Sequence, residues 1–173
     1  MTQNENKYPG TPLSEKDFAD GNILFHHDEL EGNFAWDTGI AIAQYLQGLK
    51  EGLLLGAFCS TCRKTVIPPR TVCEWCFRPM DHYVELEDTG TVNTFSLCYV
   101  TWDVKRISEP VIPAVIEIDG ASPLHGIMHM LGEVDPDQVH IGMKVKAVWK
   151  PTVDRAGAIT DILYFKPLEE VKK

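Results

Sequence analysis

The spacing of apolar residues predicts one helix in the first third of the chain. In the segment WDTGIAIAQYLQGLKEG, residues 36–52, apolar positions recur at steps of three and four, which is typical of a helix that buries one face. These positions are Ile42, Tyr45, Leu46 and Leu49. Asp37 or Thr38 can cap the first turn, and Gly52 can end the last one. The apolar face could pack on the chain's own core or dock on another protein, and the sequence leaves both open.

After residue 80 the pattern changes to an alternation of apolar and polar positions, which predicts strands. The strand segments are HYVELEDTGTVNTFSLCYVTWD, VIPAVIEIDG, SPLHGIMHMLGEV, GMKVKAVWKP and AITDILYFKPL. Gly, Pro and Asp residues separate them, as expected of turns, and Gly126 is expected to mark a bulge. Five or six short strands in residues 81–167 favour a small five-stranded Greek-key barrel of the OB type.

The segment before the helix has little periodicity and many polar residues. Residues 1–35 are therefore expected to form an extension that is partly ordered at best. The run His26, His27, Asp28 and Glu29 could bind a metal, although a solvated turn is favoured. We predict an extension over 1–35, a helix over 36–52, a cysteine module over 53–80, a barrel over 81–167 and a tail over 168–173.

The sequence CSTCRKTVIPPRTVCEWC follows a strand-like segment, LLLGAFC, and contains two CxxC pairs separated by ten residues. The four cysteines are Cys59, Cys62, Cys73 and Cys76. Thiolates are soft anionic ligands, and four of them on two tight turns form a tetrahedral cage that suits zinc. Pro68 and Pro69 would stiffen the arm between the pairs. The spacing is that of a zinc ribbon.

Four cysteine ligands would leave no coordination position for water, so the metal would be structural and would contribute to folding this module. Iron in a rubredoxin-like site uses the same ligand set, and the spacing does not separate it from zinc. Thioredoxin-like redox chemistry would need a CxxC in a βαβ setting, which the pattern does not show. Cys98, in a strand, is expected to be a buried small apolar residue.

Charge is distributed unevenly along a chain whose formal net charge is -9. Residues 53–80 carry four basic and one acidic residue and so form a positive island between acidic flanks. An acidic chain is a poor non-specific ligand for nucleic acid, but a local anion site remains compatible with it. The longest apolar run is too short to cross a membrane, and the first residues do not resemble a signal peptide. We expect a cytoplasmic protein, bound to neither nucleic acid nor membrane.

The sequence offers no familiar catalytic motif. It contains no GxSxG, GxGxxG, Walker loop or HExxH. His125 and His129 are four residues apart and could share one face of a strand, but ordinary strand histidines are the favoured interpretation. A catalytic role for this chain on its own is therefore not expected.

The segment YLQGLKEGLLLGAFCSTCRKTVIPPRTVCEWC combines a helix, a strand, two CxxC pairs and the intervening PPR. With GTVNTFSLCYVTW and GMKVKAVW further on, it resembles the zinc-ribbon/OB-fold family of acyl-CoA-associated proteins, long catalogued as a domain of unknown function. The resemblance runs from about Trp36 to Phe165. It implies a mainly β protein with an N-terminal helix, a rubredoxin-like zinc ribbon and a five-stranded OB-type barrel.

The resemblance also implies an accessory role without catalysis. Members of this family are partners of thiolase-superfamily enzymes: acyl-CoA thiolases, 3-hydroxy-3-methylglutaryl-CoA synthases or thiolase-like aldolases. The ribbon and barrel would help to bind or channel acyl-CoA, while the catalytic Cys and His lie on the partner subunit. The expected ligands are thus structural Zn²⁺ and CoA or acyl-CoA, in a hetero-oligomer that forms or cleaves C–C bonds.

A CoA-binding role would give the positive island a purpose, because Arg and Lys bind phosphates and an aromatic ring can stack on adenine. The candidate residues are Lys64, Arg70, Trp102, Lys105 and Arg106. Arg70 could instead pair with an acid of the ribbon, and Lys105 and Arg106 could belong to a solvated loop.

Two other functions stay open. The first is binding of single-stranded nucleic acid, for which ribbons and OB barrels are also used. The second is a free-standing CoA-ester enzyme with His125 or His129 as acid or base.

Overall fold

The computed structural model describes residues 13–23, 32 and 34–168. The described chain divides into two units, one ending at Trp36 and the other beginning at Asp37. The first unit contains a short helix, α1 (Glu15–Ala19), which the sequence analysis did not predict. Asp17 stabilises its first turn by accepting hydrogen bonds from the N–H and the hydroxyl of Ser14. The His26–Glu29 run lies outside the described residues.

The predicted helix is present as α2 (Gly39–Glu51). At its start, the N–H of Gly39 donates to Asp37. It ends at Gly52, whose φ of 84° is a left-handed conformation that glycine adopts without strain. The apolar face packs on the chain's own core, since Tyr45 and Leu49 belong to the main apolar cluster and Leu46 packs against it. The sequence left open whether this face packs on the chain's own core or docks on another protein, and in the structure it packs on the chain's own core.

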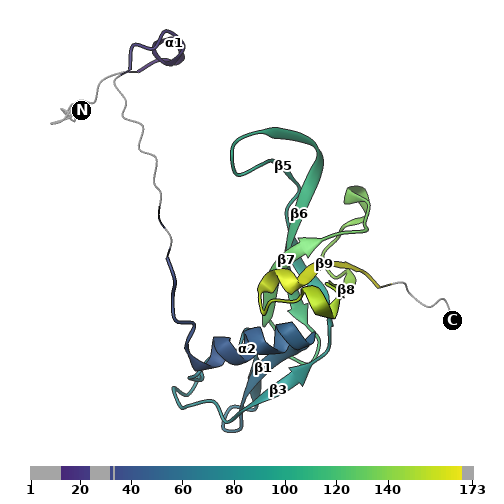
Figure 1. The fold of residues 1–173 in the computed structure, drawn as a ribbon. Coiled ribbons are helices and arrows are strands. Elements are labelled where there is room, and N and C mark those ends of the chain that lie inside the picture. The colour runs from purple at the N-terminus through teal and green to yellow at the C-terminus, as the bar shows by residue number, and fades with distance from the viewer. Residues whose placement is uncertain (1–12, 24–31, 33, 169–173) are drawn as a thin grey trace, which may run out of the picture. The chain divides into compact units, whose positions relative to one another are not determined.

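The segment before the barrel forms a three-stranded antiparallel sheet in the order β2-β1-β3, which we call the ribbon sheet. Its strands are β1 (Leu54–Cys59), β2 (Lys64–Val66) and β3 (His82–Leu86). Ala57 of β1 lies between Val66 of β2 and Tyr83 of β3. Helix α2 packs against β1, and Figure 1 shows the helix beside this sheet. The ribbon sheet thus joins the end of α2 to the cysteine loops.

Five of the remaining strands close into a barrel, as predicted. They are β4 (Thr89–Phe95), β6 (Arg106–Ile118), β7 (Gly126–Leu131), β8 (Lys144–Trp149) and β9 (Ile162–Pro167). The pairing runs β4-β8-β9-β7-β6, and a further β4–β6 pairing closes the ring. All contacts are antiparallel except β7–β9, which is parallel and consists of the single pair Leu131↔Phe165. Between β7 and β8 lies the short helix η1 (Pro136–Gln138), and η2 (Thr152–Asp154) and η3 (Ile159–Asp161) precede β9.

The alternation read from the sequence sets the barrel core. In β8, Val145 and Ala147 are buried while Lys144 and Lys146 face outwards. The bulge expected at Gly126 is wrong, because the register between β6 and β7 is unbroken there. This position needs glycine for another reason: a Cβ would lie 2.0 Å from the carbonyl oxygen of Ile116 on the neighbouring strand.

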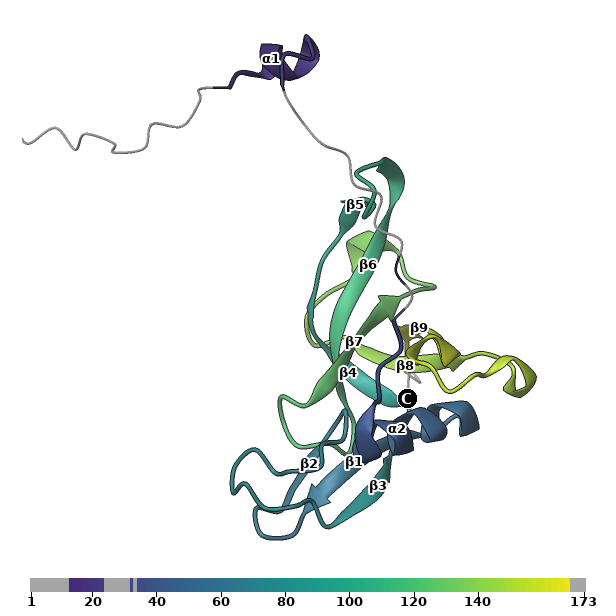
Figure 2. The ribbon, with the colours of Figure 1, turned by 60° about the vertical axis from the view of Figure 1, so that its left-hand side comes forward.

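Strand β5 (Cys98–Val100) pairs only with the first part of β6. Together they form a hairpin, residues 98–111, which we call the arm. Figures 1 and 2 both show the arm at the end of the barrel opposite the ribbon sheet. Cys98, expected to be buried, is half-buried at its base. None of the described helices has the length and apolar character needed to cross a membrane.

Candidate functional site

The two CxxC pairs meet at the end of the ribbon sheet. All four cysteine sulfurs lie within 4.8 Å of one another, and the Cys59 and Cys76 sulfurs are 3.7 Å apart. A tetrahedral ion with metal–sulfur bonds of about 2.3 Å holds its sulfurs about 3.8 Å apart. Cys59 and Cys73 are buried, and Cys62 and Cys76 are half-buried. The four residues could therefore bind a metal ion, and their chemistry and spacing are compatible with structural zinc.

Backbone geometry is repeated around the two cysteine pairs. The residue after each pair has a left-handed backbone, Arg63 with φ 53° and Phe77 with φ 55°. In the second pair the N–H of Phe77 donates to the carbonyl of Cys73, and the N–H of Cys73 donates to the carbonyl of Arg78. Such tight turns point both sulfurs of a pair towards one place, which a shared ion requires.

The thiol environments differ across the cluster. Burial and the neighbouring sulfurs raise the pKa of the Cys62 thiol to about 12. Burial also acts to raise the pKa of Cys73, but the N–H groups of Cys76 and Trp75 hydrogen-bond its sulfur and lower that pKa to about 7. Amide donors aimed at a sulfur stabilise the thiolate, which is the form that binds metal.

Two of the predicted anion-binding residues come together where the ribbon meets the barrel. Lys64 lies 5.8 Å from the centre of the Trp75 ring, and Arg70 pairs with Glu74. The Trp75 ring meets His125 edge-on at 5.3 Å. His125 also approaches Glu74, with 3.5 Å between its Nε2 and the carboxylate. We call these five residues the junction cluster.

Hydrogen bonds fix the barrel side of the junction cluster against the ribbon. The N–H of Thr65 donates to the Ser122 hydroxyl, and the N–H of Ser122 donates back to the Thr65 carbonyl, both at 2.9 Å. Burial lowers the pKa of His125, against the opposing influence of Glu74. Sequence reasoning missed Glu74 and Trp75. The available signal was the position of a charged and an aromatic residue between the two cysteines of the second CxxC pair.

The other three predicted residues lie elsewhere. Trp102 is 96% exposed at the tip of the arm. Lys105 pairs with Asp103 at 2.6 Å, and Arg106 begins β6 opposite Val100. Because the arm and the ribbon sheet lie at opposite ends of the barrel (Figure 2), the five candidates do not form one site. The ion pair of Arg70 with an acid of the ribbon, considered as an alternative, is present.

The two histidines considered for catalysis do not share a site. His129 accepts a hydrogen bond from the N–H of Met130 on Nδ1 (2.9 Å), and its Nε2 lies 3.2 Å from the carbonyl oxygen of Ile159. This pattern fits a neutral ring with its proton on Nε2, so both nitrogens are occupied. His125 instead contacts Trp75 and Glu74 in the junction cluster.

Comparisons with known proteins agree with this architecture. Residues 83–150 match the sequence family described as the C-terminal OB-fold domain of ChsH2. A DUF35 domain-containing scaffold protein of Methanocaldococcus jannaschii is 29% identical over 119 residues, which span 67% of this chain and 82% of that protein. The family match therefore covers β4 to β8 and ends before β9.

Two solved structures share the fold. A DUF35 protein of unknown function from Sulfolobus solfataricus superposes with a TM-score of 0.55 at 27% identity, covering 64% of this chain and 79% of that one. A chain of the Ltp2–ChsH2(DUF35) aldolase superposes with a TM-score of 0.56 at 22% identity, covering 78% and 98%. In sequence and in fold the chain is thus similar to DUF35 OB-fold proteins.

Proposed function

We propose that this protein is a non-catalytic, zinc-containing accessory subunit that binds a thiolase-superfamily partner in the cytoplasm. The observation that carries the proposal is its similarity to a protein named as a DUF35 scaffold, over 82% of that protein's length. A structural relative occurs in an aldolase together with Ltp2. Partner reactions would be C–C bond formation or cleavage on acyl-CoA, as in a thiolase, a 3-hydroxy-3-methylglutaryl-CoA synthase or a thiolase-like aldolase.

The histidine contacts support a role without catalysis. A general base needs a free lone pair within reach of its substrate, and both nitrogens of His129 are engaged with the backbone. His125 packs against Trp75, and its side chain is only 12% exposed. In this proposal the chain's residues bind and position, and the reacting groups belong to the partner.

Zinc is the metal we propose for Cys59, Cys62, Cys73 and Cys76. Zinc bound by four thiolates would have no open position, so its contribution would be to hold the two cysteine turns together. These turns carry Glu74 and Trp75 and lie next to Lys64, so the metal would also hold the junction cluster in shape. Iron in the same cage would be coloured, and absorption spectroscopy separates the two metals.

We propose that the junction cluster contributes the CoA contacts of this chain. Lys64 and Arg70 offer two cations for phosphate, and the 45% exposed Trp75 offers a ring for the adenine. Phosphate would compete with Glu74 for Arg70, because the two form an exposed ion pair of low net strength.

The arm is the element we propose to contact the partner. Trp102 is 96% exposed and Val104 is 82% exposed at its tip. The turn is held by Thr101, whose N–H donates to the Lys105 carbonyl and whose hydroxyl accepts from the Lys105 N–H. A rigidly presented tryptophan is a typical binding hot spot. In this arrangement Trp102, Lys105 and Arg106 would reach CoA only if the partner holds it beside the arm.

Purification of the tagged chain from its own cells, followed by native mass spectrometry and metal analysis, tests the accessory role. We expect a thiolase-like subunit in stoichiometric amount and one zinc per chain. A metal-loaded chain that is recovered alone or with nucleic acid would contradict the proposal and would favour the enzyme or the nucleic-acid binder. Trp102→Ala should reduce partner recovery, whereas Phe77→Ala, another exposed aromatic change, should not.

CoA binding by the purified complex separates the two groups of candidates. Replacing Lys64 and Arg70 by Ala should weaken CoA binding roughly tenfold, as expected for lost charge-assisted hydrogen bonds. The matched pair Lys105→Ala with Arg106→Ala should leave it unchanged if the arm does not reach CoA. The opposite ranking would move the CoA contacts to the arm.

A further inference from the structure

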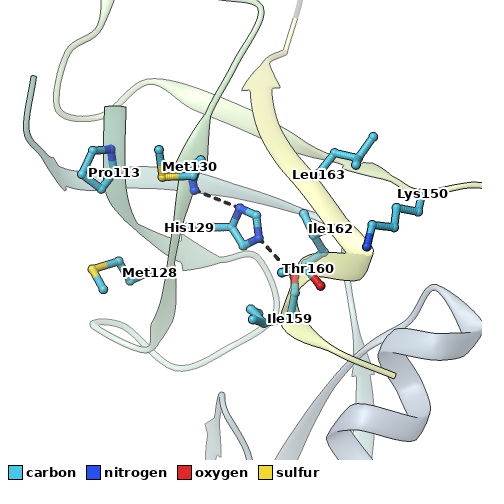
Figure 3. Close-up of a pocket in the computed structure, with 9 residues that line it drawn as sticks. All are labelled: Pro113, Met128, His129, Met130, Lys150, Ile159, Thr160, Ile162 and Leu163. Carbon is cyan, nitrogen blue, oxygen red and sulfur yellow. Dashed lines mark hydrogen bonds between the residues drawn. The ribbon is translucent and has the colours of Figure 1, made fainter. Parts of the chain in front are cut away.

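A second candidate ligand site lies in the barrel wall between β7 and β9. These strands pair only at Leu131↔Phe165, and beyond that point the wall opens into a cleft of about 480 Å³. Its apolar walls come from both sides of the opening: Met128, Met130, Ile159, Ile162 and Leu163. Figure 3 shows the two methionine side chains on the Pro113 side of β7, and the His129 ring between β7 and the residues of η3.

His129 closes the back of the cleft. Its ring spans the opening by hydrogen bonding to the N–H of Met130 on its own strand and to the carbonyl of Ile159 across the gap (Figure 3). The ring also meets Phe165 of the core edge-on at 5.8 Å. The cleft therefore has a fixed back wall and does not continue into the barrel core there.

Lys150 gives the cleft a positive charge at one rim. Figure 3 shows its ammonium group pointing towards Thr160 and Ile162. Among the described residues, no carboxylate lies within ion-pair distance of this lysine. The carboxylate of Asp161 interacts electrostatically with Lys150. This carboxylate is buried, however, and already accepts hydrogen bonds from the N–H groups of residues 156–158. Among the described residues, Lys150 thus makes no direct ion pair, and it lies beside an apolar cleft.

We propose that this cleft binds a medium-sized organic carboxylate, with its charged end on Lys150 and its apolar body along Met128 and Met130. A volume of about 480 Å³ is within the range of small-molecule sites. At about 30 Å³ for a water-sized group, it has room for about 15 non-hydrogen atoms. Methionine side chains adapt to different apolar shapes, so the site is suited to a class of acyl chains or compact ring systems.

This inference goes beyond the accessory role and does not depend on it. The cleft shares no residue with the junction cluster or the arm. Its ligand needs neither CoA nor a partner subunit for recognition, so the purified full-length chain with its metal is sufficient for the test.

Titration with octanoate, read by ¹³C-methyl signals of methionine, tests the site directly. The chain has five methionines, of which Met80 and the buried Met143 lie outside the cleft and serve as internal references. We expect saturable shifts at Met128 and Met130 only. Decanoate should bind more tightly by up to about fourfold for each added methylene, and octanol more weakly than octanoate. Absence of saturable shifts at Met128 and Met130 would overturn the proposal.

Two variants test the assigned roles. Lys150→Met should weaken octanoate binding roughly three- to tenfold and leave octanol binding unchanged, whereas Lys105→Met on the arm should change neither. Leu163→Trp, at a 45% exposed position, should fill the cleft and abolish both shifts while the Met143 signal stays in place. Equal octanoate affinity for the wild type and Lys150→Met would overturn the carboxylate assignment.

Discussion

The ribbon sheet and the barrel reach a fixed conformation by different means. The ribbon has short strands, and its far end is two loops whose cysteines converge within 4.8 Å. The barrel has a continuous apolar interior in which Ile116, Val145 and Phe165 are completely buried. A short segment with little apolar surface cannot offset its loss of conformational entropy by packing alone. Four converging cysteines that could bind a metal ion serve the loops of the ribbon, whereas burial serves the barrel and also the base of the ribbon, where Leu54 and Ile67 join the same apolar cluster.

The largest expected effect comes from removing the metal ligands. Cys73→Ser, or a strong chelator, should abolish metal binding. The cysteine loops should then unfold, because structural zinc sites contribute about 10 kcal/mol or more to folding of the segment they close. Metal analysis and hydrogen exchange would show loss of protection in residues 59–80, with the barrel amides still protected. A barrel that unfolds together with the ribbon would show that the two regions form one cooperative unit.

A core substitution addresses the barrel. Phe165→Ala should lower the free energy of unfolding by about 3–5 kcal/mol, because it removes a fully buried ring. Leu163→Ala, two residues away on the exposed side of the same strand, should cost less than about 1 kcal/mol. Denaturant unfolding measures both. The folded Phe165→Ala protein should still bind close to one metal ion per chain. Loss of the metal would contradict the idea that the ribbon and the barrel are stabilised independently.

Asp161 makes a pH-dependent contribution to the stability of the barrel. Although burial opposes it, three backbone N–H groups and the charge of Lys150 lower the pKa of this carboxyl. The folded pKa is below the unfolded one, so the carboxylate stabilises the fold above about pH 4, and this contribution is lost as the pH falls through the folded pKa. Asp161→Asn should cost about 1–3 kcal/mol at neutral pH. Unfolding measured from pH 3 to 7 should show a smaller pH dependence for the variant than for the wild type.

The smallest expected effect is at Tyr45, where α2 meets the core. Its hydroxyl is buried and has no hydrogen-bond partner within the described part of the chain, and burial raises its pKa to about 12. Tyr45→Phe removes an unsatisfied polar group and keeps the ring, so stability should stay the same or rise by up to about 1 kcal/mol. A clear loss of stability in denaturant unfolding would mean that the hydroxyl has a partner in solution.

Particular residues show how far sequence reasoning reached. The helix ends at Gly52 as expected, the alternation of β8 is the one read from its residues, and the four cysteines converge. Each of these features depends on local spacing, because the helix period, the strand period and the CxxC turn set the relative directions of side chains only a few residues apart. Gly126 was misread, because its requirement comes from the close approach of Ile116 on another strand.

The grouping of the candidate anion-binding residues could not be predicted in the same way. Lys64 and Lys105 are equivalent in sequence terms, yet one lies beside Trp75 and the other at the tip of the arm. Their separation depends on the path of the chain between them. The partner of Arg70 depends on how the loop between the cysteine pairs folds back.

The sequence by itself determined the elements of this protein: one amphipathic helix, a four-cysteine module and a set of alternating strands. Tertiary structure decided that the helix face is buried in the chain's own core, that Trp75 and His125 meet, and that β7 and β9 separate beside Lys150. The physical reason is range. Spacing along the chain fixes contacts within an element, whereas closure of the barrel brings together residues whose separation in sequence carries no signal of their contact.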